Sequence, residues 1–369
     1  MSSKPSINIG FQTDDGHAWM TSIALRSLIS AFEHSPNSQT YSLRFIFISH
    51  GLNAENAALL QRNCRSESVE IHHETVDCPL KATIPAERRI ELFTLRLHFP
   101  EVLPHLDRLL FLDSDILVVD DISKLWEVDL RGHCLGAAAC LNVSDDVSLR
   151  NYNNEFKIQF KQAIDPINGG VALLDLKKMR ELHVTQSLLD WLHAHRDTAY
   201  NPDQEAISMH CGGQFTALPP EWNFRLFAEP YWTSSWRGYR EYIKLKPSLI
   251  HFQDPLRPNL LRGNLPYFSE WIACHNEVMQ SELKSARRIS YFMFVYFEFY
   301  FIITWLAGGI ASYRWRTFLT GVALFPYSLF KYTQYALTPE TYRFRIAKEL
   351  SHVPPAKLGK NQLAQASPR

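Results

Sequence analysis

The chain has 369 residues, of which 46% are hydrophobic and 13% aromatic, and its 38 Lys and Arg balance its 38 Asp and Glu. This length allows a large buried core, and one large α/β domain with appendages fits it better than several small domains. The zero net charge gives no global electrostatic case for nucleic-acid binding. The six cysteines include no Cys-x-x-Cys pair, which argues against a disulfide scaffold or a structural zinc site and fits a reducing compartment.

The first half of the chain alternates between strand-like and helix-like segments. Apolar runs predict strands at 7–11, 42–49, 69–73, 109–112, 116–119 and 136–141. Helical periodicity predicts helices at 18–32, 53–62 and 87–99, the last ending near Pro100. Another helix is expected to start at 201–205, and a last strand at 242–252. This alternation predicts a doubly wound, largely parallel sheet with a site at the carboxyl ends of its strands.

The triplet Asp113-Ser114-Asp115 stands directly between two apolar runs. On an extended chain, two carboxylates at positions i and i+2 point to the same side. Two neighbouring like charges at the end of a sheet are costly unless a cation neutralises them. Most such triplets are solvated turns, but the buried-looking runs on either side favour a site for an oxygen-preferring divalent metal, Mg²⁺ or Mn²⁺.

Five motifs, in order, resemble glycosyltransferase family 8, which includes bacterial lipopolysaccharide galactosyl- and glucosyltransferases and, more distantly, glycogenin. The motifs are FQTDDGH, RLHFPEVLPHLDRLLFLDSDILVVDDISKLW, INGGVALLDLKKMR, NPDQEAIS and IHFQDPLRPN. The resemblance covers roughly residues 7–260. It implies a GT-A-like (Rossmann-like) nucleotide-diphospho-sugar transferase fold with a mixed, mostly parallel central sheet.

The resemblance also implies a metal centre beside a diphosphate. Asp113 and Asp115 match the family's metal-binding triplet, and His251 matches the third protein ligand, a set that suits Mn²⁺, with Mg²⁺ as the alternative. Arg257 stands where the family has a lysine that grips the diphosphate, and it keeps the charge while changing the geometry. Asp254 stands where the family has glycine, and this departure implies altered donor binding.

Further positions match residues that hold the donor. Asp14 matches a contact to the nucleotide base, although it also suits the N-terminal cap of a helix. His17 stands where an aromatic ring stacks on uracil, and Arg96 matches a contact to donor sugar or phosphate. Asn168 begins an Asn-Gly-Gly turn that would bind sugar hydroxyls or would simply be a turn. The matches beside the anomeric carbon are Asp203, as a ligand of sugar hydroxyls, and Gln204, too weak a nucleophile for a covalent intermediate.

The composition changes near residue 285, and we expect a catalytic domain at 1–284, an aromatic and basic membrane-associating region at 285–345 and a disordered tail at 346–369. Residues 289–310 are long enough to span a bilayer, but Glu298 and the many aromatic residues favour an interfacial segment. Attachment of residues 289–330 to the surface of the cytoplasmic leaflet is preferred over a true transmembrane or re-entrant hairpin and over a soluble helical subdomain. The N-terminus lacks the apolar core of a signal peptide, so a cytoplasmic location is expected.

Together these features predict a retaining hexosyltransferase. It would move galactose or glucose from a UDP-sugar to a saccharide acceptor, such as a lipopolysaccharide core or another lipid-linked glycan. Two alternatives use the same residues. One is a metal-dependent sugar-nucleotide hydrolase with water as the acceptor, and the other is a non-catalytic protein that binds sugar nucleotides or glycans. Nucleic acid is not an expected partner.

Overall fold

The structure is a computed structural model that describes residues 4–49, 51–77, 95–139, 167–195, 202–211, 214–225, 245–252 and 267–280. The predictions for Asp254, Arg257 and the region from 285 to 369 lie outside these residues, as does the boundary expected at 284. Within the described ranges, no helix has both the length and the hydrophobicity needed to cross a membrane.

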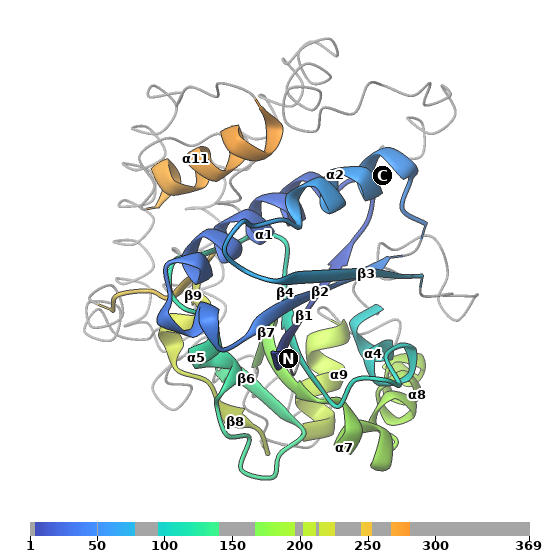
Figure 1. Cartoon of the computed structure of the whole chain (residues 1–369). Coiled ribbons are helices and arrows are strands. Elements are labelled where there is room, and N and C mark those ends of the chain that lie inside the picture. Colours follow the sequence, from blue (N-terminus) through green and yellow to red (C-terminus); the bar gives the residue numbers. More distant parts are fainter. Residues whose placement is uncertain are drawn as a thin grey trace, which may run out of the picture.

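Seven strands form one mixed sheet in the order β3-β2-β1-β4-β7-β6-β8 (Figure 1). Neighbouring strands are parallel except at β7, which runs antiparallel to both β4 and β6. The strands are β1 (Ser6–Thr13), β2 (Ser42–Ser49), β3 (Ile71–Asp77), β4 (Arg108–Leu112), β6 (Leu135–Ala139), β7 (Ile167–Asp175) and β8 (Thr216–Ala217). The expected mixed, mostly parallel sheet is confirmed. The reversal at β7 brings the start of that strand to the carboxyl end of β4.

A second sheet of three strands has the order β5-β10-β9. It consists of β5 (Ile116–Val118), β10 (Leu249–His251) and β9 (Phe224–Arg225). Strand β10 is antiparallel to β5 and parallel to β9. The expectation that Asp113 and Asp115 lie on an extended chain is therefore wrong. They lie in a bend where the chain leaves the large sheet after β4 and enters the small one at β5.

Helices cover both faces of the large sheet (Figure 1). One face carries α1 (Ala18–Glu33), α2 (Ala54–Asn63) and α11 (Phe268–Met279), and α1 packs against the other two helices. On the other face lie α4 (Phe99–Val102), α7 (Leu176–Glu181), α8 (Val184–His195) and α9 (Pro202–Cys211). The short elements are η1 (Pro36–Gln39), η2 (Leu95–His98), α5 (Ser123–Trp126) and η3 (Pro220–Asn223).

The core follows from the two-residue period of the strands. Along β4, Leu110 and Leu112 pack into the cluster beneath α1, whereas Leu109 and Phe111 pack into the cluster beneath α4, α7 and α8. Because successive side chains of a strand point to opposite faces, continuous apolar runs are what a sheet covered on both sides requires. The strands expected at 7–11 and 42–49 and the helices expected at 18–32 and 53–62 are confirmed.

The helix expected at 87–99 is wrong in its described part. Residues Leu95–His98 form the 3-10 turn η2, and α4 begins at Phe99, with Pro100 in its first turn. Proline has no backbone N–H, and a helix does not need one in its first turn, so Pro100 suits a helix start. Arg96 consequently lies in a tight turn next to the sheet and not on the surface of a longer helix.

Candidate functional site

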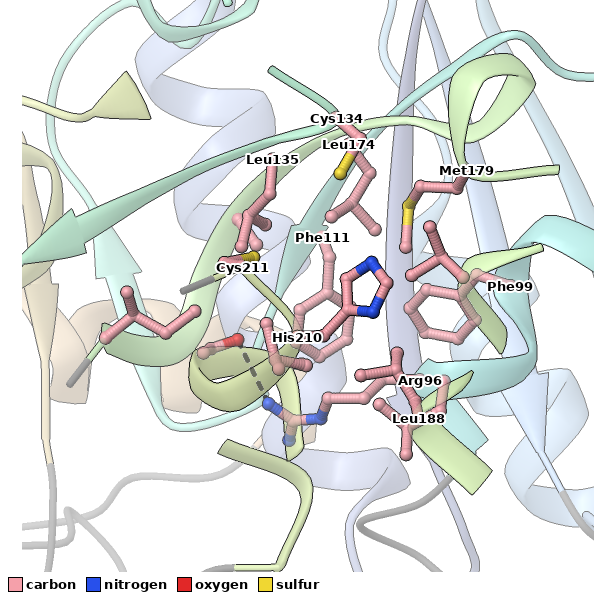
Figure 2. Close-up of a pocket in the computed structure, with 16 residues that line it drawn as sticks. Arg96, Phe99, Phe111, Cys134, Leu135, Leu174, Met179, Leu188, His210 and Cys211 are labelled. Carbon is pink, nitrogen blue, oxygen red and sulfur yellow. Dashed lines mark hydrogen bonds between the residues drawn. The ribbon is translucent and has the colours of Figure 1, made fainter. Parts of the chain in front are cut away.

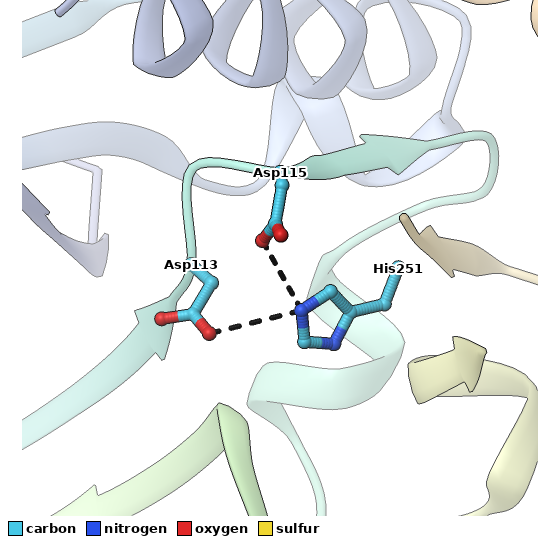
Figure 3. A group of neighbouring side chains, drawn as sticks. All are labelled: Asp113, Asp115 and His251. Carbon is cyan, nitrogen blue, oxygen red and sulfur yellow. Dashed lines mark hydrogen bonds and ion pairs between the residues drawn. The ribbon is translucent and has the colours of Figure 1, made fainter. Parts of the chain in front are cut away.

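Three side chains that are far apart in the sequence converge where the two sheets meet. Asp113, Asp115 and His251 each offer one ligand atom, and these atoms all lie within 4.8 Å of one another (Figure 3). His251 Nε2 lies 3.1 Å from Oδ1 of Asp115 and 3.7 Å from Oδ2 of Asp113. His251 is 1% exposed and Asp115 9% exposed. Two carboxylates and an imidazole this close fit the donor set that divalent cations such as Mn²⁺ bind.

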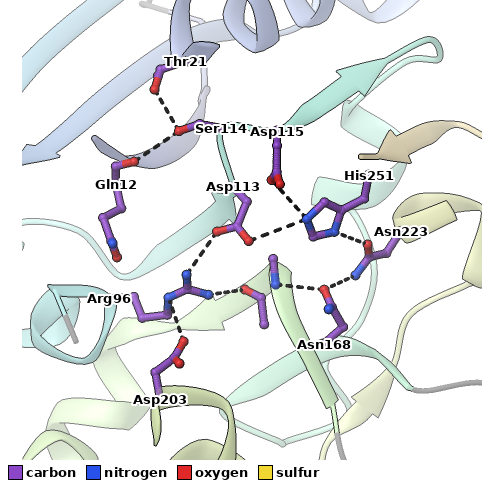
Figure 4. A network of polar contacts seen from close by, with 12 residues as sticks. Gln12, Thr21, Arg96, Asp113, Ser114, Asp115, Asn168, Asp203, Asn223 and His251 are labelled. Atoms are coloured by element: carbon purple, nitrogen blue, oxygen red, sulfur yellow. Dashed lines mark hydrogen bonds and ion pairs between the residues drawn. The ribbon is translucent and has the colours of Figure 1, made fainter. Parts of the chain in front are cut away.

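Hydrogen bonds hold the backbone of both aspartates in the bend. The Asp113 N–H donates to the Gly170 carbonyl of β7 at 2.8 Å, and the Phe252 N–H donates to the Asp115 carbonyl at 2.8 Å. Between them, the Ser114 hydroxyl lies 2.8 Å from that of Thr21 on α1 and donates to the Gln12 carbonyl at the end of β1 (Figure 4). The middle residue of the triplet therefore anchors the bend, while its neighbours turn towards His251.

Gly170 has no room for a side chain. A Cβ atom there would lie 2.3 Å from Cε1 of His251 and 2.6 Å from Oδ2 of Asp113. Contacts this short are excluded for real Cβ atoms, so glycine is required where β7 passes beneath two of the converging side chains. The Asn-Gly-Gly segment lies within strand β7, so the turn expected there is wrong, and the close approach of its backbone is part of the site.

Arg96 connects the carboxylate cluster to helix α9. Its Nη2 lies 3.1 Å from Oδ1 of Asp113, its Nη1 donates to the Gly169 carbonyl at 3.0 Å, and its Nε lies 3.3 Å from Oδ2 of Asp203. The guanidinium also lies over the Phe111 ring, 4.7 Å from its centre. Burial opposes the charge on Arg96, but the surrounding aspartates outweigh it and raise the arginine pKa. Arg96 therefore carries a permanent positive charge into the centre of the site.

An apolar pocket lies on the other side of Arg96 (Figure 2). Its lining includes Phe99, Phe111, Met179, Leu188 and His210. Since these side chains offer few polar partners, the guanidinium directs its hydrogen bonds towards Asp113 and Gly169 and its second ion pair towards Asp203. Interactions of a charge that borders such an apolar region are stronger than interactions in water.

The first turn of α9 presents two of the predicted residues. Asp203 is 3% exposed, and burial raises the pKa of its carboxyl, with Arg96 opposing the rise and Asp113 adding to it. Gln204 packs beside Gly169, since its Cγ lies 3.6 Å from the position a Cβ would take there. Asp203 therefore interacts with Asp113 of the carboxylate cluster and Gln204 lies beside Gly169, although both residues are far from these partners in the sequence.

Asn168 and Asn223 complete the polar network (Figure 4). Asn168 Oδ1 accepts hydrogen bonds from the Gly170 N–H at 3.1 Å and from Asn223 Nδ2 at 2.8 Å, and Asn223 Oδ1 lies 2.8 Å from Nδ1 of His251. Asn223 is 2% exposed. Sequence reasoning missed Asn223 because one asparagine between Trp222 and Phe224 carries no chemical signal. The parallel pairing of β9 with β10 brings it to His251.

Asp14 and His17 lie at the carboxyl end of β1, at the start of α1. Asp14 Oδ1 accepts the His17 N–H at 2.8 Å and lies 2.6 Å from His17 Nδ1. Burial alone would raise the pKa of Asp14, but the hydrogen bonds and charge of His17 bring it below its usual value. The N-terminal cap of α1 is His17, so the alternative role of Asp14 as the cap of that helix is wrong, and its contact with His17 lies in the turn before the helix. Both side chains stay partly exposed. Arg257 lies outside the described residues.

Comparisons with solved structures identify the fold. The galactosyltransferase LgtC, solved in complex with donor and acceptor sugar analogues, matches with a TM-score of 0.59 at 20% identity, over 77% of this chain and 100% of that one. The bifunctional glycosyltransferase WbbM matches with a TM-score of 0.60 at 16% identity, over 76% of this chain and 52% of that one. The fold is therefore the GT-A-like α/β fold of sugar transferases.

Sequence comparisons identify the family. General stress protein A of Bacillus subtilis (strain 168) is 21% identical over 242 residues, which are 63% of this chain and 82% of that protein. The family model described as "Glycosyl transferase family 8" matches residues 8–258. The chain belongs to glycosyltransferase family 8 and is a glycosyltransferase, which transfers a sugar from a donor to an acceptor. The predicted resemblance is confirmed.

Proposed function

We propose that this chain is a retaining, UDP-sugar-dependent hexosyltransferase that uses Mn²⁺, or alternatively Mg²⁺, held by Asp113, Asp115 and His251. The observation that carries the proposal is the convergence of these three side chains, within 4.8 Å of one another, at the end of β4. Galactose or glucose is the proposed sugar. A saccharide, such as a lipopolysaccharide core or another lipid-linked glycan, is the proposed acceptor.

The residues around the cluster support a transfer between bound sugars. A divalent cation bound there would supply positive charge to neutralise the departing nucleoside diphosphate. Arg96 orients Asp113 and Asp203 through its two ion pairs, and Asp203 is placed to accept hydrogen bonds from sugar hydroxyls. Gln204 is a neutral amide and a feeble nucleophile, which favours attack of the acceptor from the leaving-group side. Positioning and electrostatic stabilisation then supply the rate enhancement.

Asp14 and His17 are proposed to contact the nucleotide, since they lie at the strand end next to the one that carries Asp113. Arg257 is proposed to bind the diphosphate and Asp254 to modify that contact. Replacing Arg257 with alanine should raise the KM for the donor, and replacing Asp254 with glycine should lower it. Equal donor KM values in all three proteins would refute both roles.

The decisive experiment measures UDP release from a panel of UDP-sugars in the presence of Mn²⁺, with and without saccharide acceptors. Asp113→Asn and Asp115→Asn should each lower the rate by about 100-fold or more, because even partners hydrogen-bonded to metal ligands cost 10–100-fold when removed. Asp190→Asn, an exposed substitution on α8, is the matched control. Full activity in either site variant would refute the assignment.

The same panel separates the proposed transferase from a hydrolase. A transferase releases UDP faster when the correct acceptor is present and forms a glycosylated product, whereas a hydrolase releases free sugar at the same rate with or without acceptor. UDP binding without turnover of any donor would instead indicate a non-catalytic binding protein. Membership of the family supports the first outcome.

Attachment to the cytoplasmic face of a membrane through residues 289–330 is a further part of the proposal, supported by the aromatic and basic composition of that region. It fits a lipid-linked acceptor. The full chain should pellet with membranes at low salt and be released by detergent. A chain that stays in the soluble fraction without detergent would refute the attachment.

A further inference from the structure

His251 is useful as a metal ligand only if the correct ring nitrogen is unprotonated. A neutral imidazole carries its proton on one nitrogen, and only the other nitrogen offers a lone pair. Nε2 is the nitrogen that faces Asp113 and Asp115, while Nδ1 faces the side chain of Asn223. A cation held with the two carboxylates therefore requires the proton on Nδ1. The side chains hydrogen-bonded to Nδ1 decide whether the proton is there.

The orientation of the Asn168 side-chain amide is fixed by a neighbouring backbone group. The backbone N–H of Gly170 can only donate, and it points at the side chain of Asn168 at 3.1 Å. The Asn168 atom at that position must therefore be the carbonyl oxygen, because an amide nitrogen has no lone pair to offer. The orientation of this first amide is thus decided by the backbone of β7.

The same oxygen decides the orientation of the second amide. Asn168 Oδ1 lies 2.8 Å from the Asn223 side chain, so the Asn223 atom facing it must be the nitrogen, which donates. The Asn223 oxygen then faces His251, 2.8 Å from Nδ1. A carbonyl oxygen accepts a hydrogen bond, so Nδ1 must carry the proton. All of these groups are buried, since Asn168 is 4%, Asn223 2% and His251 1% exposed.

We infer that Asn223 is a positioning residue that sets the tautomer and ring orientation of His251, through a relay that starts at the Gly170 N–H and passes through Asn168. The inference rests on the metal site of the proposed function, but it concerns residues that do not touch the cation. It links the proposed sugar-facing residue Asn168 to the metal ligand His251. A change at Asn168 should consequently alter cation binding.

The test is the affinity of the full chain for Mn²⁺ alone, measured by the loss of the free Mn²⁺ signal in electron paramagnetic resonance. Asn223→Leu keeps the approximate volume but removes both hydrogen bonds, and it should weaken binding 10–100-fold, as is typical for partners of metal-ligating histidines. Asn223→Asp loses the bond to Asn168 but keeps an oxygen acceptor facing Nδ1, and it should bind more tightly than Asn223→Leu. Rescue by aspartate but not by leucine distinguishes positioning from simple packing.

The relay adds a second comparison at Asn168. Asn168→Ala removes the group that orients Asn223 and should weaken Mn²⁺ binding, by less than Asn223→Leu. Asn168→Asp keeps an oxygen that accepts both bonds and should bind more tightly than Asn168→Ala. The matched control is Asn37→Ala, which removes two side-chain hydrogen bonds, to Asp121 and Ser123, from a separate network and should leave Mn²⁺ affinity unchanged.

The outcomes separate this inference from the proposed function. If the wild type binds Mn²⁺ and Asn223→Leu binds it equally well, the inference is overturned and the metal site stands. If only Asn168→Ala matches the wild type, the relay through Asn168 is overturned. A wild type that binds no Mn²⁺ overturns the metal site itself. With Mg²⁺ bound, ¹⁵N spectra of labelled histidine should show the proton of His251 on Nδ1, and a proton on Nε2 would overturn the inference.

Discussion

Replacing Gly170 with alanine is the sharpest single test of the site. The added methyl group would lie 2.3 Å from Cε1 of His251 and 2.6 Å from Oδ2 of Asp113. Strand β7 cannot easily move away, because it is paired on both sides, with β4 and with β6, and the Gly170 carbonyl accepts the Asp113 N–H. The two side chains must therefore give way, and both are proposed metal ligands.

The size of the effect follows from the distances. Ordinary van der Waals contact begins at 3.4 Å, so the His251 ring must shift by about 1 Å, whereas ligand distances in metal sites hold within about 0.2 Å. His251 is buried and hydrogen-bonded to Asn223, so this shift also strains its surroundings. Overpacking of this kind costs about 1–3 kcal/mol of stability. We expect Mn²⁺ affinity to fall at least tenfold, which is about 1.4 kcal/mol.

The assay is a Mn²⁺ titration of the full chain, accompanied by thermal unfolding without metal. Gly136→Ala on the neighbouring strand β6 is the matched control, because its Cβ would lie 2.8 Å from Cδ2 of Leu130 and so overpacks an apolar contact. Both variants should unfold at lower temperature, but only Gly170→Ala should lose Mn²⁺ affinity. Wild-type affinity in Gly170→Ala would refute the placement of β7 beneath the ligands.

Three further predictions test other parts of the structure. Arg96→Met leaves buried Asp203 without its cation and should cost about 3–5 kcal/mol of stability in urea unfolding, whereas Arg96→Lys should cost less; equal losses would show that charge is unimportant there. Trp271→Ala on α11 removes a ring that is 1% exposed and should lower the free energy of unfolding by about 3–5 kcal/mol, with one cooperative thermal transition. A separate early transition would show that α11 does not unfold together with the catalytic domain. The lowered pKa of Asp14 means that this carboxylate stabilises the fold above its unfolded pKa, near 3.8, and that the contribution is lost as pH falls through the lower folded pKa. His17→Ala should raise the Asp14 pKa in an NMR titration, and an unchanged pKa would refute the pairing.

Much of the chain could be predicted because its signals are local. Apolar runs and helical periodicity identified β1, β2, α1 and α2, since each pattern reports which face of one element is buried. The triplet Asp113-Ser114-Asp115 suggested a cation site without reference to any other segment. The ordered motifs added the family, and with it the choice of His251 as the partner of the two carboxylates.

Other features depend on which strands pair, and no local pattern contains that information. The antiparallel register of β4 with β7 places Gly170 against Asp113, and the pairing of β9, β10 and β5 places Asn223 against His251 and His251 against Asp115. Strand pairing is settled by the burial of all the strands together. The sequence by itself therefore predicted the three side chains that converge at the candidate metal site. Only the tertiary structure decided that Arg96 connects Asp113 to Asp203 and that Asn223 orients the histidine, because these contacts join segments between 17 and 107 residues apart.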